Sequence, residues 1–272
     1  MPSRPPHEET ARLVRDVERL AHPDATPVVR VPTGYRAVTR SATYAFWATL
    51  PLFVLYEVGI VLANRGEGQI RVGADVWIKN VLNAVGLGGG VMLGVVVTAL
   101  GLAVWWSERG RRPPLVGRYL GGIVVESLVY AVLLAYVVGG AVGALFGGWV
   151  WPDLALAQLA QLSLGLQLAL SIGAGLYEEL VFRVLLVGGL FLALRRVTSS
   201  PTRAYVIAAL VGAVVFSAVH HMGPYGDPFS LSVFTFRFLF GLALNGVFLL
   251  RGFAVAAWTH ALYDVLVVTG GL

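Results

Sequence analysis

The sequence predicts an all-α membrane protein, a transmembrane helical bundle of about seven or eight spans. Apolar residues make up 57% of the 272 residues and charged residues only 13%, and the mean hydropathy is +0.76. A water-soluble globular domain of this size does not have such a composition. Apolar stretches near the 20 or so residues that a membrane-spanning helix needs also recur along the chain.

The predicted elements follow from these stretches. Residues 1–40 are the only sizeable soluble part, and apolar residues at helical spacing among charges predict an amphipathic helix there, at the membrane surface. Residues 41–150 hold N-terminal transmembrane helices, and residues 151–272 form a C-terminal transmembrane core. The predicted spans are 41–63, 80–106, 118–146, 174–195, 203–221, 231–250 and 252–270, whereas 154–172 could cross the membrane, re-enter it or lie along its surface.

Charge distribution predicts a multi-pass protein of the cell membrane with a cytoplasmic N-terminus. Lys and Arg number 20 against 15 Asp and Glu, and the excess falls in loops beside the spans, as the positive-inside rule requires. Arg30, Arg36 and Arg40 precede the first span, so the lipid bilayer explains the positive charge and no nucleic-acid partner is needed. The absence of cysteine excludes disulfides, thiolate catalysis and Cys-zinc sites.

The same rule bears on the side of the membrane at which later spans open. The basic loops at 107–118 and after 195 should both be cytoplasmic. The span 118–146 leads to the outside, so an odd number of crossings must separate its end from the second loop. If 154–172 does not cross, Glu178 lies in the outer part of its span. If 154–172 crosses, every later element is inverted and Glu178 faces the cytoplasm.

The first unusual motif is the run of two acids and a base at Glu178, Glu179 and Arg183 inside an apolar span. Charges at that depth cost about 2.5 to 3.5 kcal/mol each, so they indicate a functional site or a buried ion-pair network. Glu179 and Arg183 stand at i and i+4 and can pair, whereas Glu178 points elsewhere. This arrangement predicts a structural ion pair and leaves Glu178 to act as a general base.

Two further motifs carry histidine. His220 closes a span one turn after Phe216, before a stretch dense in turn formers, and His221 points to a different side. His260 and Asp264 are at i and i+4 on the final span, where they share one helix face. Such a pair can orient a histidine, bind a metal, stabilise a transition state, or simply tie the last helix to the bundle.

Taken together, the three motifs resemble the CPBP (CAAX protease and bacteriocin-processing) family of intramembrane endopeptidases, whose pattern is EExxxR, FxxxH and HxxxN or HxxxD. The resemblance covers about 155–270 and implies a catalytic core made of Glu178, Glu179, Arg183, His220, His260 and Asp264. It implies a hydrolase whose substrate is a membrane-anchored or lipid-modified protein or peptide. In such an enzyme Glu178 would activate water, with His220 holding or polarising it.

The resemblance does not decide the roles of His260 and Asp264. Prenyl-peptide-cleaving members carry Asn where this chain has Asp264, so a prenylated substrate is less strongly indicated. An ionised Asp264 would repel an oxyanion, so this residue must be protonated, bind His260 or ligate a metal. One possible cofactor is zinc held by His220, His260 and Asp264, and a metal-free glutamate mechanism fits the same residues.

Two alternatives from other functional classes fit parts of the sequence. A non-proteolytic membrane protein, for bacteriocin immunity or as a scaffold, could retain the fold and its polar network. A proton-coupled transporter could use Glu57, Glu126 and Glu178 as a relay. The simpler interpretation of Glu57, Glu126 and Arg237 is Arg–Glu pairing across helices.

Overall fold

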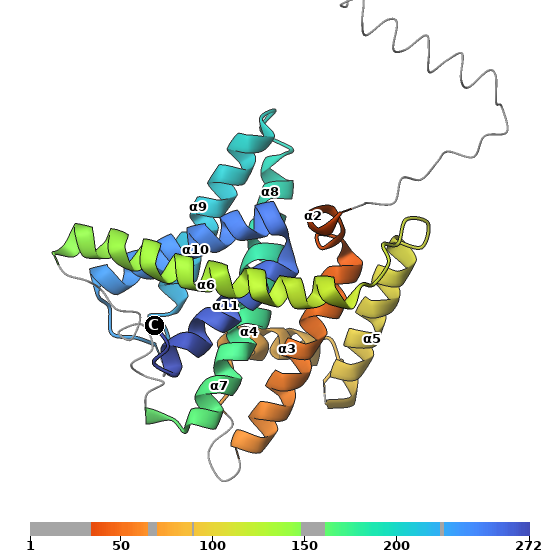
Figure 1. The fold of residues 1–272 in the computed structure, drawn as a ribbon, viewed down its shortest axis with the longest axis horizontal. Coiled ribbons are helices and arrows are strands. Elements are labelled where there is room, and N and C mark those ends of the chain that lie inside the picture. Colours follow the sequence, from red (N-terminus) through yellow and green to blue (C-terminus); the bar gives the residue numbers. More distant parts are fainter. Residues whose placement is uncertain (1–33, 65–69, 89, 148–160, 224–225) are drawn as a thin grey trace, which may run out of the picture.

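The computed structural model describes residues 34–64, 70–88, 90–147, 161–223 and 226–272, and every element in these ranges is helical (Figure 1). The all-α prediction is therefore confirmed. The amphipathic helix predicted within 1–40 lies almost wholly outside the described residues. The elements are α2 (Tyr35–Val38), α3 (Ala42–Ala63), α4 (Gly73–Ala84), α5 (Gly90–Ser107), α6 (Gly117–Phe146), α7 (Leu164–Gly173), η3 (Ala174–Val187), α8 (Gly188–Leu194), α9 (Pro201–Val219), α10 (Leu231–Arg251) and α11 (Phe253–Val268).

Four of these helices, α3, α6, α9 and α10, are long and apolar enough to cross a membrane. The last helix, α11, is apolar but shorter, and so is the part of α5 at Gly94–Ser107. Many large apolar side chains of α3 and α6 are exposed, among them Val58, Leu62, Val129 and Leu133. Exposed apolar surface of this extent fits contact with lipid and supports a membrane location. The count of seven or eight spans is not confirmed.

The predicted span 80–106 is wrong, because the structure breaks it into α4 and α5. Gly86 follows α4 with a φ of +79°, a left-handed conformation that favours glycine and ends the helix. Residues 86–88 are therefore outside both helices. After the break, α4 is a separate helix that packs against η3.

The structure describes the region 154–172 only from residue 161 onwards, because 148–160 lie outside the described residues. Ser163 caps α7 by accepting a hydrogen bond from the backbone N–H of Leu166. From there α7, η3 and α8 follow one another without a gap to Leu194. The central part, η3, is a π-helix, a wide helical form that is often found at functional sites. The side of the membrane to which this helix opens stays a prediction.

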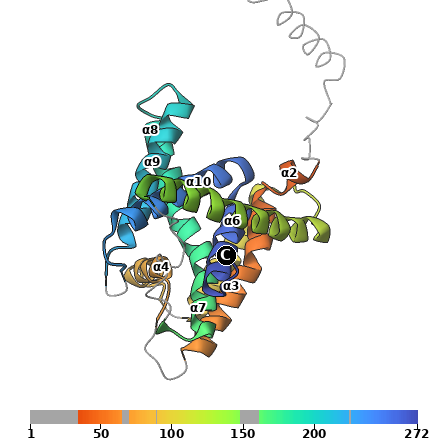
Figure 2. The same cartoon turned by 60° about the vertical axis from the view of Figure 1, so that its left-hand side comes forward.

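The final helix, α11, forms the centre of the bundle (Figures 1 and 2). It packs against α6, η3, α7, α10 and α3. Gly252, with a φ of +86°, makes the turn that folds α11 back from α10. Small residues at its start let neighbouring backbones approach, and Ala254, Ala256 and Ala257 are completely or almost completely buried. The core thus positions His260 and Asp264 in the interior of the bundle.

Candidate active site

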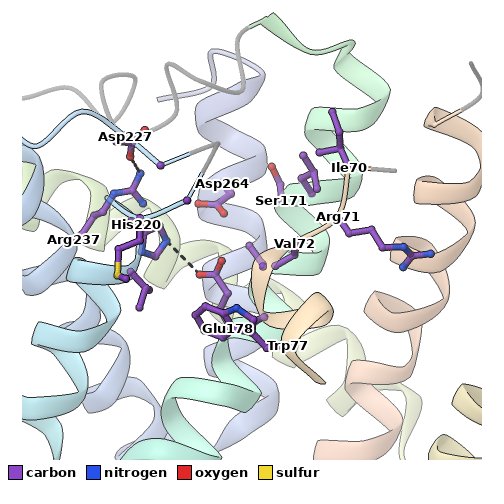
Figure 3. Close-up of a pocket in the computed structure, with 18 of the residues that line it drawn as sticks. Ile70, Arg71, Val72, Trp77, Ser171, Glu178, His220, Asp227, Arg237 and Asp264 are labelled. Atoms are coloured by element: carbon purple, nitrogen blue, oxygen red, sulfur yellow. Dashed lines mark hydrogen bonds and ion pairs between the residues drawn. The ribbon is translucent and has the colours of Figure 1, made fainter. Parts of the chain in front are cut away.

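The structure brings the three motifs together around one pocket of about 560 Å³ (Figure 3). Glu178 comes from η3, His220 from the end of α9 and Asp264 from α11, and all three line this pocket. Glu179 and Arg183 are buried behind its wall, and His260 lies between the two groups. All six predicted site residues therefore form one connected cluster, and three of them reach the cavity.

His220 faces Glu178 through its Nε2 atom, which lies 3.5 Å from Glu178 Oε2. Its other nitrogen, Nδ1, lies 2.6 Å from the backbone oxygen of Phe216. Because a carbonyl oxygen only accepts, Nδ1 must carry a hydrogen, and in the neutral ring Nε2 then holds a lone pair. The FxxxH spacing thus fixes the tautomer, and it turns the free nitrogen towards the glutamate.

The Glu178 carboxylate has one oxygen available in the pocket. Within the described residues, Oε2 is buried and makes no hydrogen bond. A buried carboxylate oxygen without a donor is costly, so a donor such as water is expected there. Water beside Oε2 would also lie within reach of His220 Nε2, and this is the geometry needed to activate it.

Glu179 joins a buried arginine and a buried histidine behind the pocket. Its Oε1 lies 2.9 Å from Arg183 Nη1 and 2.7 Å from His260 Nδ1. The ion pair predicted from the i, i+4 spacing is therefore present, and it is buried: Glu179 is 0% and Arg183 1% exposed. A carboxylate that accepts from Nδ1–H fixes the orientation of an imidazole.

Phe216 is the aromatic contact that these groups share. Arg183 Cζ lies 4.5 Å from the centre of its ring, a cation–π distance. The rings of His220, Phe182 and His260 lie edge-on to it, at 4.7, 5.2 and 6.0 Å between centroids. Phe216, the first residue of the FxxxH motif, therefore contacts both histidines directly.

His260 and Asp264 meet on one face of α11, as their spacing predicted. His260 Nε2 lies 3.6 Å from Asp264 Oδ2, and Asp264 reaches the pocket. Since His260 Nδ1 donates to Glu179, a hydrogen between Nε2 and Oδ2 must belong to one of those two atoms. At this distance the two atoms are in electrostatic contact and are not hydrogen-bonded, and a proton carried by Asp264 lies beside the cavity.

The residues present do not fit the predicted three-ligand zinc site. Among the described residues, no group of three or more His, Asp or Glu side chains is placed to hold a metal ion. His220 and Asp264 line the same pocket, whereas His260 does not line it. The zinc hypothesis therefore has no geometric support here and stays a prediction.

Sequence reasoning missed the wall that the N-terminal half contributes. Residues 70–74 and Trp77 line the pocket, and the Trp77 ring lies edge-on to Phe182 with centroids 6.4 Å apart. The wall is fixed by Asp75, which is 0% exposed and pairs with Arg71 at 2.9 Å and Lys79 at 2.8 Å. The i, i+4 spacing of these three charges was the available signal.

Glu57 connects that wall to η3. It pairs with Arg71 at 3.3 Å and with Lys79 at 3.1 Å, and it accepts a hydrogen bond from the Tyr177 hydroxyl at 3.1 Å. Tyr177 directly precedes Glu178 in η3. The position of Glu178 and the position of α4 therefore depend on a common carboxylate.

The other isolated charges also have partners. Glu126 of α6 pairs with Arg251 of α10 across helices, so the Arg–Glu interpretation is confirmed for Glu126. Arg237 pairs with Asp227 rather than with a glutamate, and both line the pocket mouth beside His220 (Figure 3). With Glu57 and Glu126 both engaged by cations, the structure does not favour the proton-relay alternative.

Comparison with known proteins agrees with the motifs. Residues 160–266 match a family model described as Type II CAAX prenyl endopeptidase Rce1-like. Searches of curated proteins and of solved structures found no match. The matched segment contains all three motifs, and it supports an intramembrane protease kind of function. The predicted resemblance is confirmed: the C-terminal core of this membrane protein is similar to the CAAX prenyl endopeptidase family.

Proposed function

We propose that this protein is an intramembrane endopeptidase that hydrolyses a peptide bond in a membrane-anchored or lipid-modified protein. The observation that carries the proposal is the facing pair Glu178 and His220, whose Oε2 and Nε2 atoms are 3.5 Å apart in a pocket of about 560 Å³. A carboxylate and an imidazole with one fixed tautomer are the groups required to position and deprotonate a water molecule.

The reaction begins when water between these two groups attacks the peptide carbonyl carbon. Glu178 takes the proton as the new carbon–oxygen bond forms, while the lone pair of His220 Nε2 holds the second hydrogen of the water. The carbonyl oxygen becomes negative in the tetrahedral intermediate. When the carbon–nitrogen bond breaks, Glu178 returns its proton to the leaving nitrogen, giving a new carboxyl end and a new amino end.

Asp264 and His260 support the negative oxygen. A proton on Asp264 can donate a hydrogen bond into the pocket, whereas an ionised Asp264 would repel the oxyanion. Glu179 and Arg183 act as positioning residues because they hold His260 and do not line the cavity. No step requires a metal ion.

The lining of the pocket indicates an apolar substrate segment. Its walls carry Val72, Trp77, Leu170, Phe182 and Val219, whereas the polar side chains gather at Glu178 and at the mouth. Apolar pockets with a few placed polar groups are typical of specific binding sites. The matched family is described as a CAAX prenyl endopeptidase. A prenylated peptide is therefore the first substrate class to test, beside an unmodified transmembrane segment.

Cleavage assays with purified protein in liposomes test the proposal. The substrates are one anchored peptide in a prenylated form and the same sequence fused to a transmembrane segment. Glu178→Gln should abolish cleavage of either form, and the same change at Glu108, outside the pocket, should leave cleavage intact. Cleavage by Glu178→Gln at the wild-type rate would overturn the role of Glu178.

The two neighbouring histidines provide a second comparison. His220→Ala should reduce the rate by about 100-fold or more, since a general-acid–base partner contributes on that order. His221 bonds through Nδ1 to the Asp227 oxygen at 3.1 Å and stacks on Phe234, so His221→Ala should retain most activity. A chelator should not change the wild-type rate. Loss of activity with chelator would instead support metal catalysis.

A further inference from the structure

A second cavity of about 410 Å³ lies between α3 and α5, and it shares no lining residue with the catalytic pocket. Its wall is almost entirely apolar, with Phe46 and Trp47 from α3 and Leu102 and Trp105 from α5. Trp47 is 47% and Trp105 53% exposed, so the cavity opens to the outside of the bundle. We refer to it as the α3–α5 groove.

The walls of the groove are fixed at two points. Glu108, just after α5, accepts hydrogen bonds from the backbone N–H groups of Ala42 and Thr43 at 2.9 and 3.0 Å, and so caps α3. Further along, Gly101 leaves room for Phe46, because a Cβ at this position would lie 2.9 Å from the end of that ring. The shape of the groove is therefore fixed by contacts between α3 and the α5 region, and it does not depend only on the positions of the exposed tryptophans.

One end of the groove is cationic. Arg112 lines it, and its Nη2 donates to the Trp105 oxygen at 2.8 Å while the guanidinium lies 5.0 Å from a Trp105 ring centre. The Cζ atom of Arg109 lies 3.9 Å from the centre of the Trp106 ring, and Arg111 lies between Arg109 and Arg112 in the sequence. In the ranges that the structure covers, none of these three arginines forms an ion pair with a carboxylate. The nearest acid along the chain, Glu108, is already used by the α3 cap.

We propose that the α3–α5 groove binds one anionic phospholipid, with an acyl chain against Phe46 and Leu102 and the phosphate at Arg112. An apolar slot that ends in an unneutralised guanidinium matches the two parts of such a lipid in both shape and charge. The tryptophans beside the arginines are the residues that occur at the headgroup level of a bilayer. A zwitterionic lipid would satisfy the slot but would leave the charge of Arg112 without net compensation.

Native mass spectrometry of the full chain tests this site without any measurement of catalysis. Protein is released from nanodiscs that contain equal amounts of phosphatidylglycerol and phosphatidylcholine. Wild-type protein should retain phosphatidylglycerol preferentially. Arg112→Gln should weaken that retention by about tenfold, as expected for loss of a hydrogen bond between charged groups. Arg112→Lys should restore part of it, because the charge remains.

Matched variants separate this site from general surface charge. Arg111→Gln removes the same charge from a neighbour outside the groove lining and should leave retention near the wild-type level. Leu102→Trp, which narrows the slot from an exposed position, should weaken retention without loss of Arg112. Equal retention of the two lipids by wild-type protein, or equal loss in Arg111→Gln and Arg112→Gln, would overturn the proposal. Competition by inorganic phosphate alone would overturn the lipid assignment.

Discussion

His260 is oriented by Glu179: the Nδ1 atom of the imidazole lies 2.7 Å from Glu179 Oε1, and that same oxygen lies 2.9 Å from Arg183 Nη1. One buried carboxylate oxygen therefore serves a cation and a catalytic-site histidine at once. Because Nδ1 is engaged, the opposite nitrogen of His260 is directed to Asp264. The orientation of the last motif, His260 and Asp264, thus depends on Glu179 of the first motif.

Glu179→Gln should therefore cost both stability and activity. The change leaves the Arg183 charge buried without a counter-charge, which lowers the free energy of unfolding by about 3 to 5 kcal/mol. The double variant Glu179→Gln, Arg183→Met removes both charges and should recover most of that stability, measured by thermal unfolding in detergent. Its cleavage rate should stay low, because His260 still lacks its carboxylate. Recovery of both stability and rate would show that Glu179 has no positioning role.

The contact between η3 and α11 depends on Gly175. A Cβ at this position would lie 2.5 Å from the Ala257 oxygen and 2.5 Å from the Ala261 nitrogen, both backbone atoms that cannot move aside locally. Gly175→Ala should separate the two helices and lower the cleavage rate and the unfolding temperature. A Cβ added at Gly165 in α7 would meet no atom within 4 Å, so Gly165→Ala should be neutral or slightly stabilising. A Gly175→Ala protein with wild-type activity would contradict this packing argument.

The residues of the candidate site were predictable from sequence because each motif pairs residues that are close along the chain. Glu179 with Arg183, His260 with Asp264 and Phe216 with His220 are each one helical turn apart, so spacing alone places each pair on one face. The three pairs could be joined because intramembrane polar groups seek one another. The pairing of Glu179 with His260, by contrast, comes from the approach of η3 to α11 and has no local signal.

The pocket wall at 70–77 could not be placed from sequence for a related reason. Hydropathy joined α4 to α5 as one span, since the apolar content of 80–106 outweighs a single turn at Gly86. If that turn is overlooked, Arg71 and Lys79 fall in the loop between the predicted spans 41–63 and 80–106. Their real environment is set by Glu57, distant in the chain, which only the folded structure brings close.

Glu57→Gln should change substrate binding more than chemistry. The neutral side chain loses its ion pairs with Arg71 and Lys79, which loosens the wall around Trp77. Its amide oxygen can still accept the hydrogen bond from the Tyr177 hydroxyl, and so η3 stays in place. We expect KM to rise several-fold with a smaller change in kcat, measured by steady-state cleavage in liposomes. Glu126→Gln breaks the other ion pair, with Arg251, and should lower thermal stability without this effect on KM. An unchanged KM in Glu57→Gln would show that the wall does not contact substrate.

Asp264→Asn tests whether a proton on Asp264 assists the reaction. In the proposed mechanism the hydrogen-bond donor that faces the oxyanion is a protonated Asp264, so activity should fall at alkaline pH as that proton is lost. An amide donates at every pH, and the variant should therefore lose the alkaline limb of its pH–rate profile. The acidic limb should remain, because Glu178 must still be ionised to accept a proton from water. An alkaline limb unchanged in Asp264→Asn would place the essential proton on another group. A folded but inactive variant would show that the reaction needs a carboxyl group at this position.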